Sequence, residues 1–170
     1  GCGGQLSCVG AGTQAVVEEL AELFPGVEVM RMDTDSVAPV GSHEQLFKRF
    51  REENIPILVG TQMVTKGLNF ENVTLVGVIS ADQSLYAGDY RAGERTFSLI
   101  TQVVGRSGRG SKPGRAVIQT FTPDNETVVQ AARQDYDEFY RTEVELRRLH
   151  DLPPFTTLFA VTASGTDEAQ

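Results

Sequence analysis

The sequence predicts an α/β fold, with a mainly parallel β-sheet and helices on both of its faces. Short apolar runs of strand length alternate with amphipathic segments of helical spacing, the pattern that parallel strands and their crossover helices produce. Glycine and proline residues separate these segments, as turns require. The chain has 170 residues, 40% of them hydrophobic, and is long enough to bury a substantial core.

The expected elements follow one another with short connections. Apolar residues in Thr13–Phe24 recur at the spacing of one helical face, and Pro25 and Gly26 end that helix. Ser42, with Gln45 three residues later, fits a capping box at the start of a second helix. The expected strands are Leu6–Val9, Val27–Met32, Ile55–Gly60, Val73–Ile79 and Ala116–Phe121; the later helices are Ala92–Val104, Asn125–Arg133 and Tyr136–Leu149.

The pattern also predicts which residues are buried. Val73–Ile79 is the most apolar strand, so we expect it to lie centrally and to be covered on both faces. The second and the last helix each need one apolar stripe against the sheet. The residues expected to be buried there are Leu46, Phe47 and Phe50, and Tyr136, Phe139 and Tyr140.

Composition narrows the class of protein. A net charge of −8 argues against a stand-alone nucleic-acid binder, although Arg106, Arg109, Lys112 and Arg115 form a local basic cluster. No apolar run reaches the ~18 residues that a membrane span needs, and we expect no membrane association. Two cysteines suit a reducing cytoplasm. The chain starts without Met and stops within a pattern, so we expect a piece of a longer protein.

The first predicted turn has two interpretations. Gly10, Gly12 and Ala15 follow a short apolar strand and open a helix, and Asp33 closes the next strand. This spacing is typical of the phosphate-binding turn of a dinucleotide-dependent dehydrogenase. The strand is, however, short and polar for the centre of a dinucleotide-binding sheet, so a simple strand-to-helix turn is the other interpretation.

The stretch "TQVVGRSGRG" (residues 101–110) carries the most specific chemistry. Gln102, Arg106 and Arg109 lie at i, i+4 and i+7, so a helix continuing that far would place all three on one side. The neighbouring glycines remove bulk, and an arginine fork pairs well with phosphate oxygens. A surface turn with solvated arginines is the alternative.

A second stretch with binding chemistry stands about forty residues earlier. It carries Thr61, Gln62, Lys66, Gly67 and Asn69, all after the apolar strand that ends at Gly60. Open α/β sheets bind ligands at the carboxyl ends of such strands. The presence of this second stretch favours the phosphate-binding interpretation of residues 101–110 over a solvated surface turn.

These two stretches resemble motifs V and VI of the second RecA-like lobe of superfamily 2 helicases. The ordered blocks "ILVGTQM…KG…F…VTLVGV", "DYRAGERTFSLITQVVGRSGRG", "PG…IQT" and "PPF" are similar to the primosomal N′ family of replication-restart DNA helicases. The resemblance covers nearly the whole chain. It implies a RecA-like lobe over residues 5–150, preceded by the last residues of a zinc-binding segment (1–4) and followed by the start of a truncated C-terminal domain (151–170). That domain would begin with a strand at Thr156–Thr162.

The resemblance implies a role for each site residue. Arg109 would be the arginine finger that reaches the γ-phosphate of ATP, and Arg106 a second phosphate or coupling arginine. Gln102 would link the helix to the nucleotide cleft, and Gly67 and Asn69 would approach the nucleotide. The DNA contacts would come from Thr61, Gln62 and Lys66.

Two departures from the family pattern concern motif V and zinc. The family commonly has K-G-H-D-F where this chain has "KGLNF", so Asn69 replaces a charged residue and Leu68 a histidine. Cys2 matches the last ligand of the zinc-binding segment, whereas Cys8 falls where the family has none. Zinc takes about four ligands, so we expect zinc in the full-length protein and none in this chain.

The resemblance implies an ATP-dependent 3′-to-5′ DNA helicase, using ATP and Mg²⁺, in replication restart and primosome assembly at stalled forks. Its partners would be forked or single-stranded DNA, primosome and helicase-loading proteins, and single-strand-binding protein, in a bacterial, nucleoid-associated cytoplasmic setting. This chain lacks the phosphate loop and the Mg²⁺-binding motif, so alone it should be inactive. The alternatives are a lobe of another superfamily 2 repair or recombination translocase and the dehydrogenase domain.

Several charged residues have structural interpretations. Asp82 ends a strand, where capping or packing between lobes is expected rather than catalysis. Ion pairs that set the helix before motif VI are expected among Asp89, Arg91, Glu94 and Arg95. His43 and His150 have no metal-ligand company in the sequence. Asp33 and Asp35 lie at a strand end, where a structural role is expected.

Overall fold

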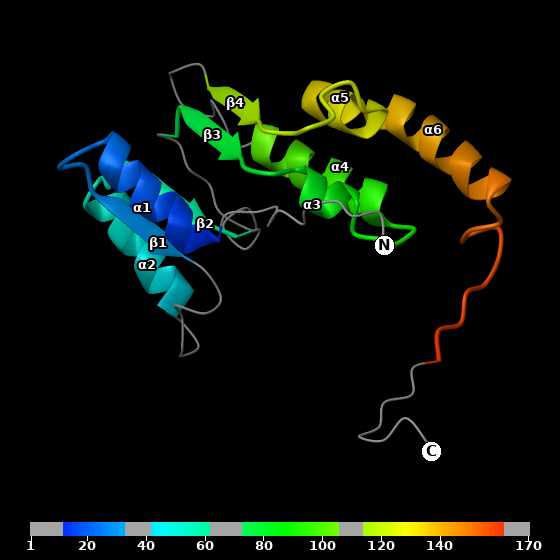
Figure 1. The fold of residues 1–170 in the computed structure, drawn as a ribbon, viewed down its shortest axis with the longest axis horizontal. Helices are drawn as coiled ribbons and strands as arrows, with labels where there is room; N and C mark the ends of the chain where they lie inside the picture. Colours follow the sequence, from blue (N-terminus) through cyan, green and yellow to red (C-terminus); the bar gives the residue numbers. More distant parts are fainter. Residues whose placement is uncertain (1–11, 33–41, 62–72, 106–113, 162–170) are drawn as a thin grey trace, which may run out of the picture.

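The computed structural model describes residues 12–32, 42–61, 73–105 and 114–161 (Figure 1). Each expected helix is present, and α3 is an additional short one. The expected strand at Leu6–Val9 lies outside the described residues. The elements are α1 (Thr13–Leu23), β1 (Val29–Met32), α2 (Ser42–Glu52), β2 (Ile57–Gly60), β3 (Leu75–Val78), α3 (Asp82–Leu85), α4 (Ala92–Val104), β4 (Arg115–Ile118), α5 (Glu126–Arg133) and α6 (Tyr136–Leu149).

All described strand pairs are parallel, which confirms the predicted type of sheet. In the register, Val29 pairs with Ile57 in β1–β2, and Leu75 pairs with Arg115 in β3–β4. The described strands form two pairs, β1–β2 and β3–β4. Parallel partners come from segments joined by a crossover, so α2 separates β1 from β2, and α3 with α4 separates β3 from β4.

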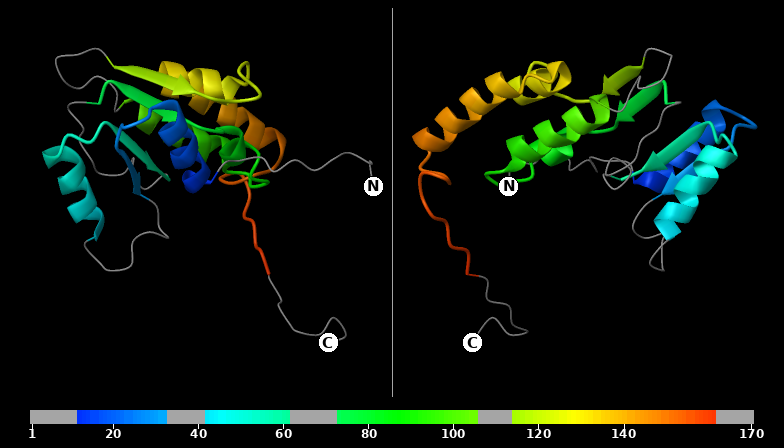
Figure 2. Two further views of the ribbon diagram at one scale, coloured as in Figure 1. Left: turned by 60° about the vertical axis from the view of Figure 1, so that its left-hand side comes forward. Right: turned by 180° about the vertical axis from the view of Figure 1, so that it is seen from behind.

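Helices cover both faces of the β1–β2 pair. In Figure 1, α1 lies in front of the strands and α2 behind them, and the reverse view in Figure 2 agrees. Met30, Met32 and Phe47 are buried between these layers. Leu46 and Phe50 of α2 are half-buried, so the predicted apolar face of this helix is confirmed in outline.

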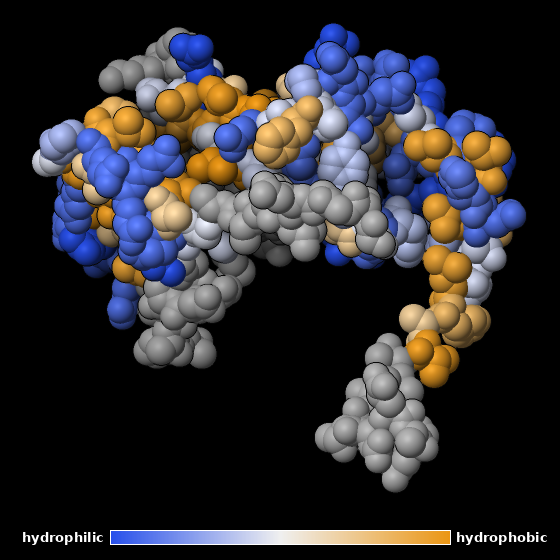
Figure 3. All heavy atoms as spheres, viewed as in Figure 1, coloured by the Kyte–Doolittle hydropathy of each residue, from blue (hydrophilic) through white to orange (hydrophobic). Residues whose placement is uncertain are grey.

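The β3–β4 pair is buried on one face only. Along both strands the side chains alternate between exposed and half-buried, and Val78 and Ile118 pack against the core below α4. Leu75 and Val117, on the other face, are exposed by 62% and 53%. Figure 3 shows hydrophobic residues gathered on the surface over these strands. The prediction that residues 73–79 are covered on both faces was therefore wrong for the described part of the chain.

The main core lies between α4, α5 and α6. Phe97 and Ile100 of α4 meet Val128 of α5 and Phe139 of α6, and all four are nearly inaccessible to solvent. The rings of Phe97 and Phe139 stack with centroids 4.1 Å apart. Tyr136 and Tyr140 are 61% and 55% exposed, so the predicted buried stripe of α6 is reduced to Phe139. A tyrosine can place one edge of its ring on the core and keep its hydroxyl in water. Sequence spacing alone does not distinguish such a tyrosine from a buried one.

The turns use the expected chemistry. Gly26, after α1, has φ +81°, a conformation that favours glycine. Asn125 caps α5 by accepting from the backbone N–H of Thr127 at 3.0 Å, and Asp135 caps α6 in the same way. α2 begins at Ser42 itself, and the side chain of Ser42 lies outside the described residues, so the capping box stays a prediction.

The segment after α6 leaves the helical layers and runs away from them (Figure 2). The expected strand at 156–162 is not formed in its described residues, 156–161, and Phe159 and Val161 are at least 90% exposed. A strand needs a neighbour to pair with, which explains the difference. Within the described part of the chain, no helix has the length and apolarity to cross a membrane.

Candidate functional site

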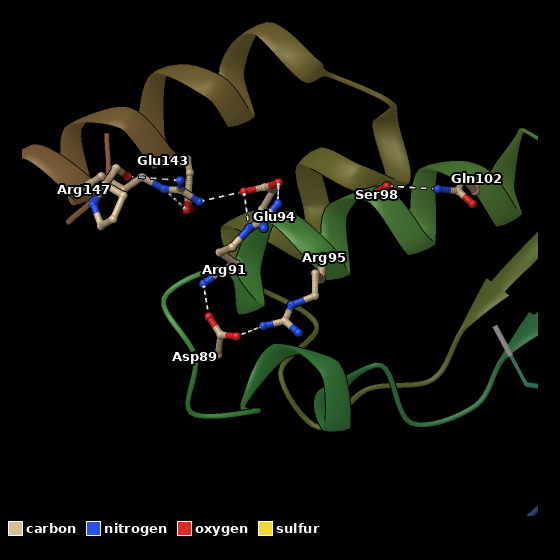
Figure 4. A network of polar contacts seen from close by, with 9 residues as sticks. Asp89, Arg91, Glu94, Arg95, Ser98, Gln102, Glu143 and Arg147 are labelled. Atoms are coloured by element: carbon tan, nitrogen blue, oxygen red, sulfur yellow. Dashed lines mark hydrogen bonds and ion pairs between the residues drawn. The ribbon is translucent and has the colours of Figure 1, made fainter. Parts of the chain in front are cut away.

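Gln102 is the predicted nucleotide-cleft residue that the structure describes. It lies on the last turn of α4 and is exposed, and its Nε2–H donates to the Oγ of Ser98 at 3.0 Å (Figure 4). Ser98 is four residues earlier, so this bond runs along one helical face. The amide is thus held on the solvent side of α4.

The arginines of the glycine-rich stretch follow directly on α4. The helix ends at Val104, and the backbone N–H of Gly105 donates to the carbonyl of Thr101 as the C-cap. The predicted common helical face of Gln102, Arg106 and Arg109 can be followed in the described residues only as far as Gly105. Arg106 and Arg109 themselves lie outside the described residues, so their roles stay predictions.

Thr61 is the one predicted DNA-contacting residue that the structure describes. It directly follows β2 and is exposed, at the carboxyl end of a parallel strand. The remaining predicted residues of this stretch and of the zinc segment lie outside the described residues: Gln62, Lys66, Gly67, Asn69 and Cys2. Among the residues that the structure describes, no group of three or more His, Cys, Asp or Glu side chains could hold a metal ion.

An ion-pair network surrounds the first turn of α4, as predicted. Arg91 donates to Glu94 at 2.9 Å, and Arg95 pairs with Asp89 (Figure 4). The hydrogen bond from Arg91 lowers the pKa of Glu94, burial opposes this shift, and a second arginine adds to the lowering. Glu94 is therefore ionised at neutral pH.

The second arginine is Arg147 of α6, which sequence reasoning missed. Its Nη2–H donates to Glu94 at 2.9 Å and its Nε–H to Glu143 at 2.8 Å. Its Nη1–H donates to the carbonyl of Pro153 at 3.2 Å, and its guanidinium lies 5.4 Å from the ring centroid of Tyr90. Burial lowers the pKa of Arg147, but the bonds to Glu143 and Glu94 outweigh burial and raise it.

Part of this arrangement was detectable in the sequence. Glu143 and Arg147 are four residues apart on a helix, in the order that favours a pair. The contact with Glu94 joins residues 53 positions apart, and no local pattern reports it. The structure explains the glycine at position 93, because a Cβ there would lie 3.3 Å from a carboxylate oxygen of Glu143.

Asp82 holds together the carboxyl ends of β3 and β4. It is 6% exposed and accepts from the hydroxyl of Thr120 at 2.9 Å, the backbone N–H of Phe121 at 3.1 Å and the hydroxyl of Thr122 at 3.2 Å. Burial raises the pKa of Asp82, but these hydrogen bonds outweigh burial and lower it. The carboxylate is occupied by structural donors, in line with the interpretation that it is not catalytic.

Comparison with known proteins identifies the family. Residues 6–111 match the helicase conserved C-terminal domain, a range that includes both predicted ligand-binding stretches. The chain is 47% identical over 161 residues to the replication restart protein PriA of Bacillus subtilis, covering 95% of this chain and 20% of that protein. The corresponding values are 45% over 149 residues for Chlamydia pneumoniae PriA (88% and 20%) and 40% over 165 residues for Synechocystis PriA (97% and 20%).

The chain thus spans about a fifth of the length of these curated relatives. Parallel strands with helices between them agree with the α/β lobe that the family implies. The family match extends over more than half of the chain, and the chain belongs to the helicase conserved C-terminal domain family.

Proposed function

We propose that this chain is the second RecA-like lobe of an ATP-dependent 3′-to-5′ DNA helicase that acts in replication restart and primosome assembly at stalled forks. The observation that carries the proposal is the helicase family match over residues 6–111, which includes the loop after β2 and the arginine-rich stretch after α4. The similarity to replication restart proteins over 95% of the chain supports the particular process. The match also includes the Gly10–Ala15 turn, which favours a strand-to-helix turn of a helicase lobe over a dinucleotide site.

In this proposal Arg109 is the arginine finger. During phosphoryl transfer, negative charge develops on the γ-phosphate oxygens, and a guanidinium aimed at them stabilises the transition state more than the ground state. Arg106 contacts a second phosphate or couples the lobes, and Gln102, Gly67 and Asn69 complete the nucleotide contacts. An asparagine at 69 keeps a hydrogen-bonding amide but gives no charge to pair with an arginine.

The rest of the machinery belongs to the other lobe of the full-length protein. That lobe supplies the phosphate loop and the Mg²⁺ ligands, so this chain alone holds half of an active site. Thr61, Gln62 and Lys66 contact the DNA backbone. Cys2 is the last ligand of a zinc site in the full-length protein, and this chain alone is expected to bind no zinc.

The proposed partners follow from this role. The full-length protein binds forked or single-stranded DNA, and it works with single-strand-binding protein and with primosome and helicase-loading proteins. Its proposed location is the bacterial cytoplasm, associated with the nucleoid.

The test uses the full-length protein and forked DNA with one labelled strand. We expect ATP hydrolysis to depend on DNA, and strand displacement to require a 3′ single-stranded arm and ATP. The isolated 170-residue chain is the control and should hydrolyse no ATP. A full-length protein without DNA-stimulated hydrolysis would contradict the proposal. Saturable NADH binding by the isolated chain would favour the dehydrogenase interpretation, and translocation on duplex DNA without fork preference would favour another superfamily 2 translocase.

A further inference from the structure

Arg147 is the most enclosed arginine of the described ion pairs. Its side chain is 14% exposed, whereas the arginines of the other described pairs are 50–59% exposed. It donates to three acceptors from three parts of the chain: Glu143 on α6, Glu94 on α4 and the carbonyl of Pro153 after α6. A guanidinium can satisfy three acceptors at once because its five N–H groups lie in a rigid fork.

We infer that Arg147 is a positioning residue: it fixes α4, and with it the arginine-bearing stretch that follows α4, to α6 and to the segment that leaves α6. This inference rests on the proposed function for its catalytic consequence. The structural part stands on the contacts alone, since one side chain joins the first turn of α4 to α6 and to Pro153.

The geometry of α4 explains how a contact at its first turn can affect its carboxyl end. Glu94 lies on the first turn and Gln102 on the last turn of α4, a single uninterrupted helix of 13 residues. Because α4 is one continuous helix, a shift or rotation at Glu94 is carried to Gly105 at its carboxyl end, which Arg106 follows in the sequence. Arg91 also holds Glu94, which keeps its carboxylate oriented toward both arginines.

The packing beside the contact leaves little freedom. Gly93, next to Glu94, has only 3.3 Å between the position of a Cβ and a carboxylate oxygen of Glu143. Because glycine has no Cβ, its presence at position 93 allows this close approach of α6. The ring of Tyr90 covers the guanidinium from a further side. The first turn of α4 is thus held in one register against α6.

The contact with Pro153 extends the coupling beyond this lobe. The carbonyl accepts from Arg147 at 3.2 Å, and the backbone N–H of Leu152 donates to the carbonyl of Arg147 at 2.8 Å. A displacement of residues 151–155 therefore acts directly on Arg147. In a longer protein, the position of whatever follows this segment is transmitted to α4 by one side chain.

The experiment uses three variants of the full-length protein: Arg147→Gln, Arg147→Lys and Arg148→Gln. Arg148 is the matched control, since it is the next residue, 59% exposed, and pairs with Glu145 on its own helix. Its guanidinium also lies 4.9 Å from the ring centroid of Phe155, so it touches the segment after α6, but none of its described contacts joins it to α4. We measure kcat and KM for ATP with saturating forked DNA, and backbone hydrogen exchange in α4. A misplacement of about 1 Å at a reacting group costs on the order of 10²-fold in rate.

We expect Arg147→Gln to lower kcat by roughly 10- to 100-fold, with KM for ATP within about threefold of wild type, and to speed exchange at the carboxyl end of α4. Arg147→Lys should remain impaired, because one ammonium cannot serve three acceptors, while Arg148→Gln should match wild type. If Arg147→Lys restores kcat fully, a simple charge suffices and the inference is wrong.

A second variant keeps the inference open to refutation if Arg147→Gln fails to fold. Glu94→Gln retains the shape of the side chain and should lower kcat in the same way. Where both variants fold, the double variant should be less impaired than the product of the two single effects, since the Arg147–Glu94 contact is lost in both while each variant also loses contacts of its own. Multiplying effects, or exchange in α4 equal to that of Arg148→Gln, would overturn the inference. Exchange does not depend on hydrolysis, so it decides the inference even if the full-length protein proves inactive and the proposed function fails.

Discussion

The two halves of the described chain are built differently. The first part, from α1 to β2, buries four apolar side chains, at Met30, Met32, Phe47 and Ile55, and α1 has no buried residue. The second part, from β3 to α6, contains the whole main core cluster, in which α4 packs against α5 and α6. The second part is therefore the better-anchored half.

The ion pairs follow the same division. In the first part Arg49 bridges to Glu28 with both side chains about half exposed, a kind of pair that contributes little. In the second part Arg147 is enclosed and serves three acceptors. The arginine stretch follows α4, which packs in the main core, whereas the Thr61 stretch follows β2 in the first part, where fewer side chains are buried. Substitutions near the arginines should therefore change the chemistry without loss of the fold.

The largest effect is expected from Arg109→Ala in the full-length protein. Arginine fingers contribute on the order of 10³–10⁵ in rate, or roughly 4–7 kcal/mol of transition-state stabilisation. DNA-stimulated hydrolysis should nearly vanish, while nucleotide affinity and the thermal midpoint change far less. The measurement is kcat for ATP with saturating forked DNA, with nucleotide affinity measured separately.

Two variants serve as its controls. Arg109→Lys should also fail, because a point charge on a flexible stem does not reproduce the fork. Arg115→Ala removes a positive charge from the exposed start of β4 and should leave kcat near that of wild type. Hydrolysis by Arg109→Ala within about tenfold of wild type would make Arg106 the candidate finger instead.

The next largest effect is a loss of stability, and it should differ between the cores of the two parts. Ile100 and Met32 are both 0% exposed, one in each part. Replacing such a residue by alanine costs about 2–5 kcal/mol, and the cost depends on how far the surroundings can collapse. We expect Ile100→Ala near the upper end, because three helices fix its cavity, and Met32→Ala near the lower end. Urea unfolding measures both, and an equal or reversed order would remove the difference between the parts.

Local patterns predicted much of this fold. The bounds expected for α4 and α6, Ala92–Val104 and Tyr136–Leu149, are those that the structure has. Relations between distant segments were out of reach. The one-sided burial of β3 depends on what packs against it, and the Arg147–Glu94 bond joins two helices. For the candidate site, the sequence named residue types, whereas the structure adds positions for Thr61 and Gln102 alone.

A pH-dependent effect is expected at Asp82. Hydrogen bonds from Phe121 and Thr120 outweigh burial and hold its pKa below the ordinary value of 3.8. This carboxylate therefore stabilises the fold fully above about that pH, and the stabilisation is lost as the pH falls through the lowered value. Asp82→Asn should lower the urea midpoint at pH 7. The gap to wild type should narrow below pH 3.8; a gap independent of pH would contradict the role of the charge.

A smaller effect is expected at the cap of α5, in the second part. The side-chain Oδ1 of Asn125 accepts from the backbone N–H groups of Thr127 and Val128 at 3.0 and 3.4 Å. Asn125→Ala should cost about 1 kcal/mol of stability, because these groups lose their acceptor. Asn125→Asp keeps the acceptor and should match wild type in urea unfolding. If Asn125→Asp is as unstable as Asn125→Ala, the hydrogen bonds are not the cause.

The smallest effect should be a gain, at the start of α1 in the first part. Gly12 is the N-cap of α1, with φ −60° and ψ 158°, and no side chain caps the helix. This extended conformation suits any residue, and a Cβ at Gly12 would meet nothing within 4 Å. Gly12→Ser should stabilise the protein by a few tenths of a kcal/mol, since serine adds an acceptor and restricts the unfolded chain.

The same substitution at Gly26 is the control for Gly12→Ser, since its φ of +81° disfavours a side chain although the space around it is open. Gly26→Ser should cost about 1 kcal/mol, because a left-handed conformation strains any residue with a Cβ. Both variants are compared by urea unfolding of this chain. A gain at Gly12 with a loss at Gly26 assigns both effects to backbone conformation. Equal losses of stability at the two positions would mean that Gly12 is not the N-cap of α1. The absence of a capping side chain would then not explain a lower stability of the first part.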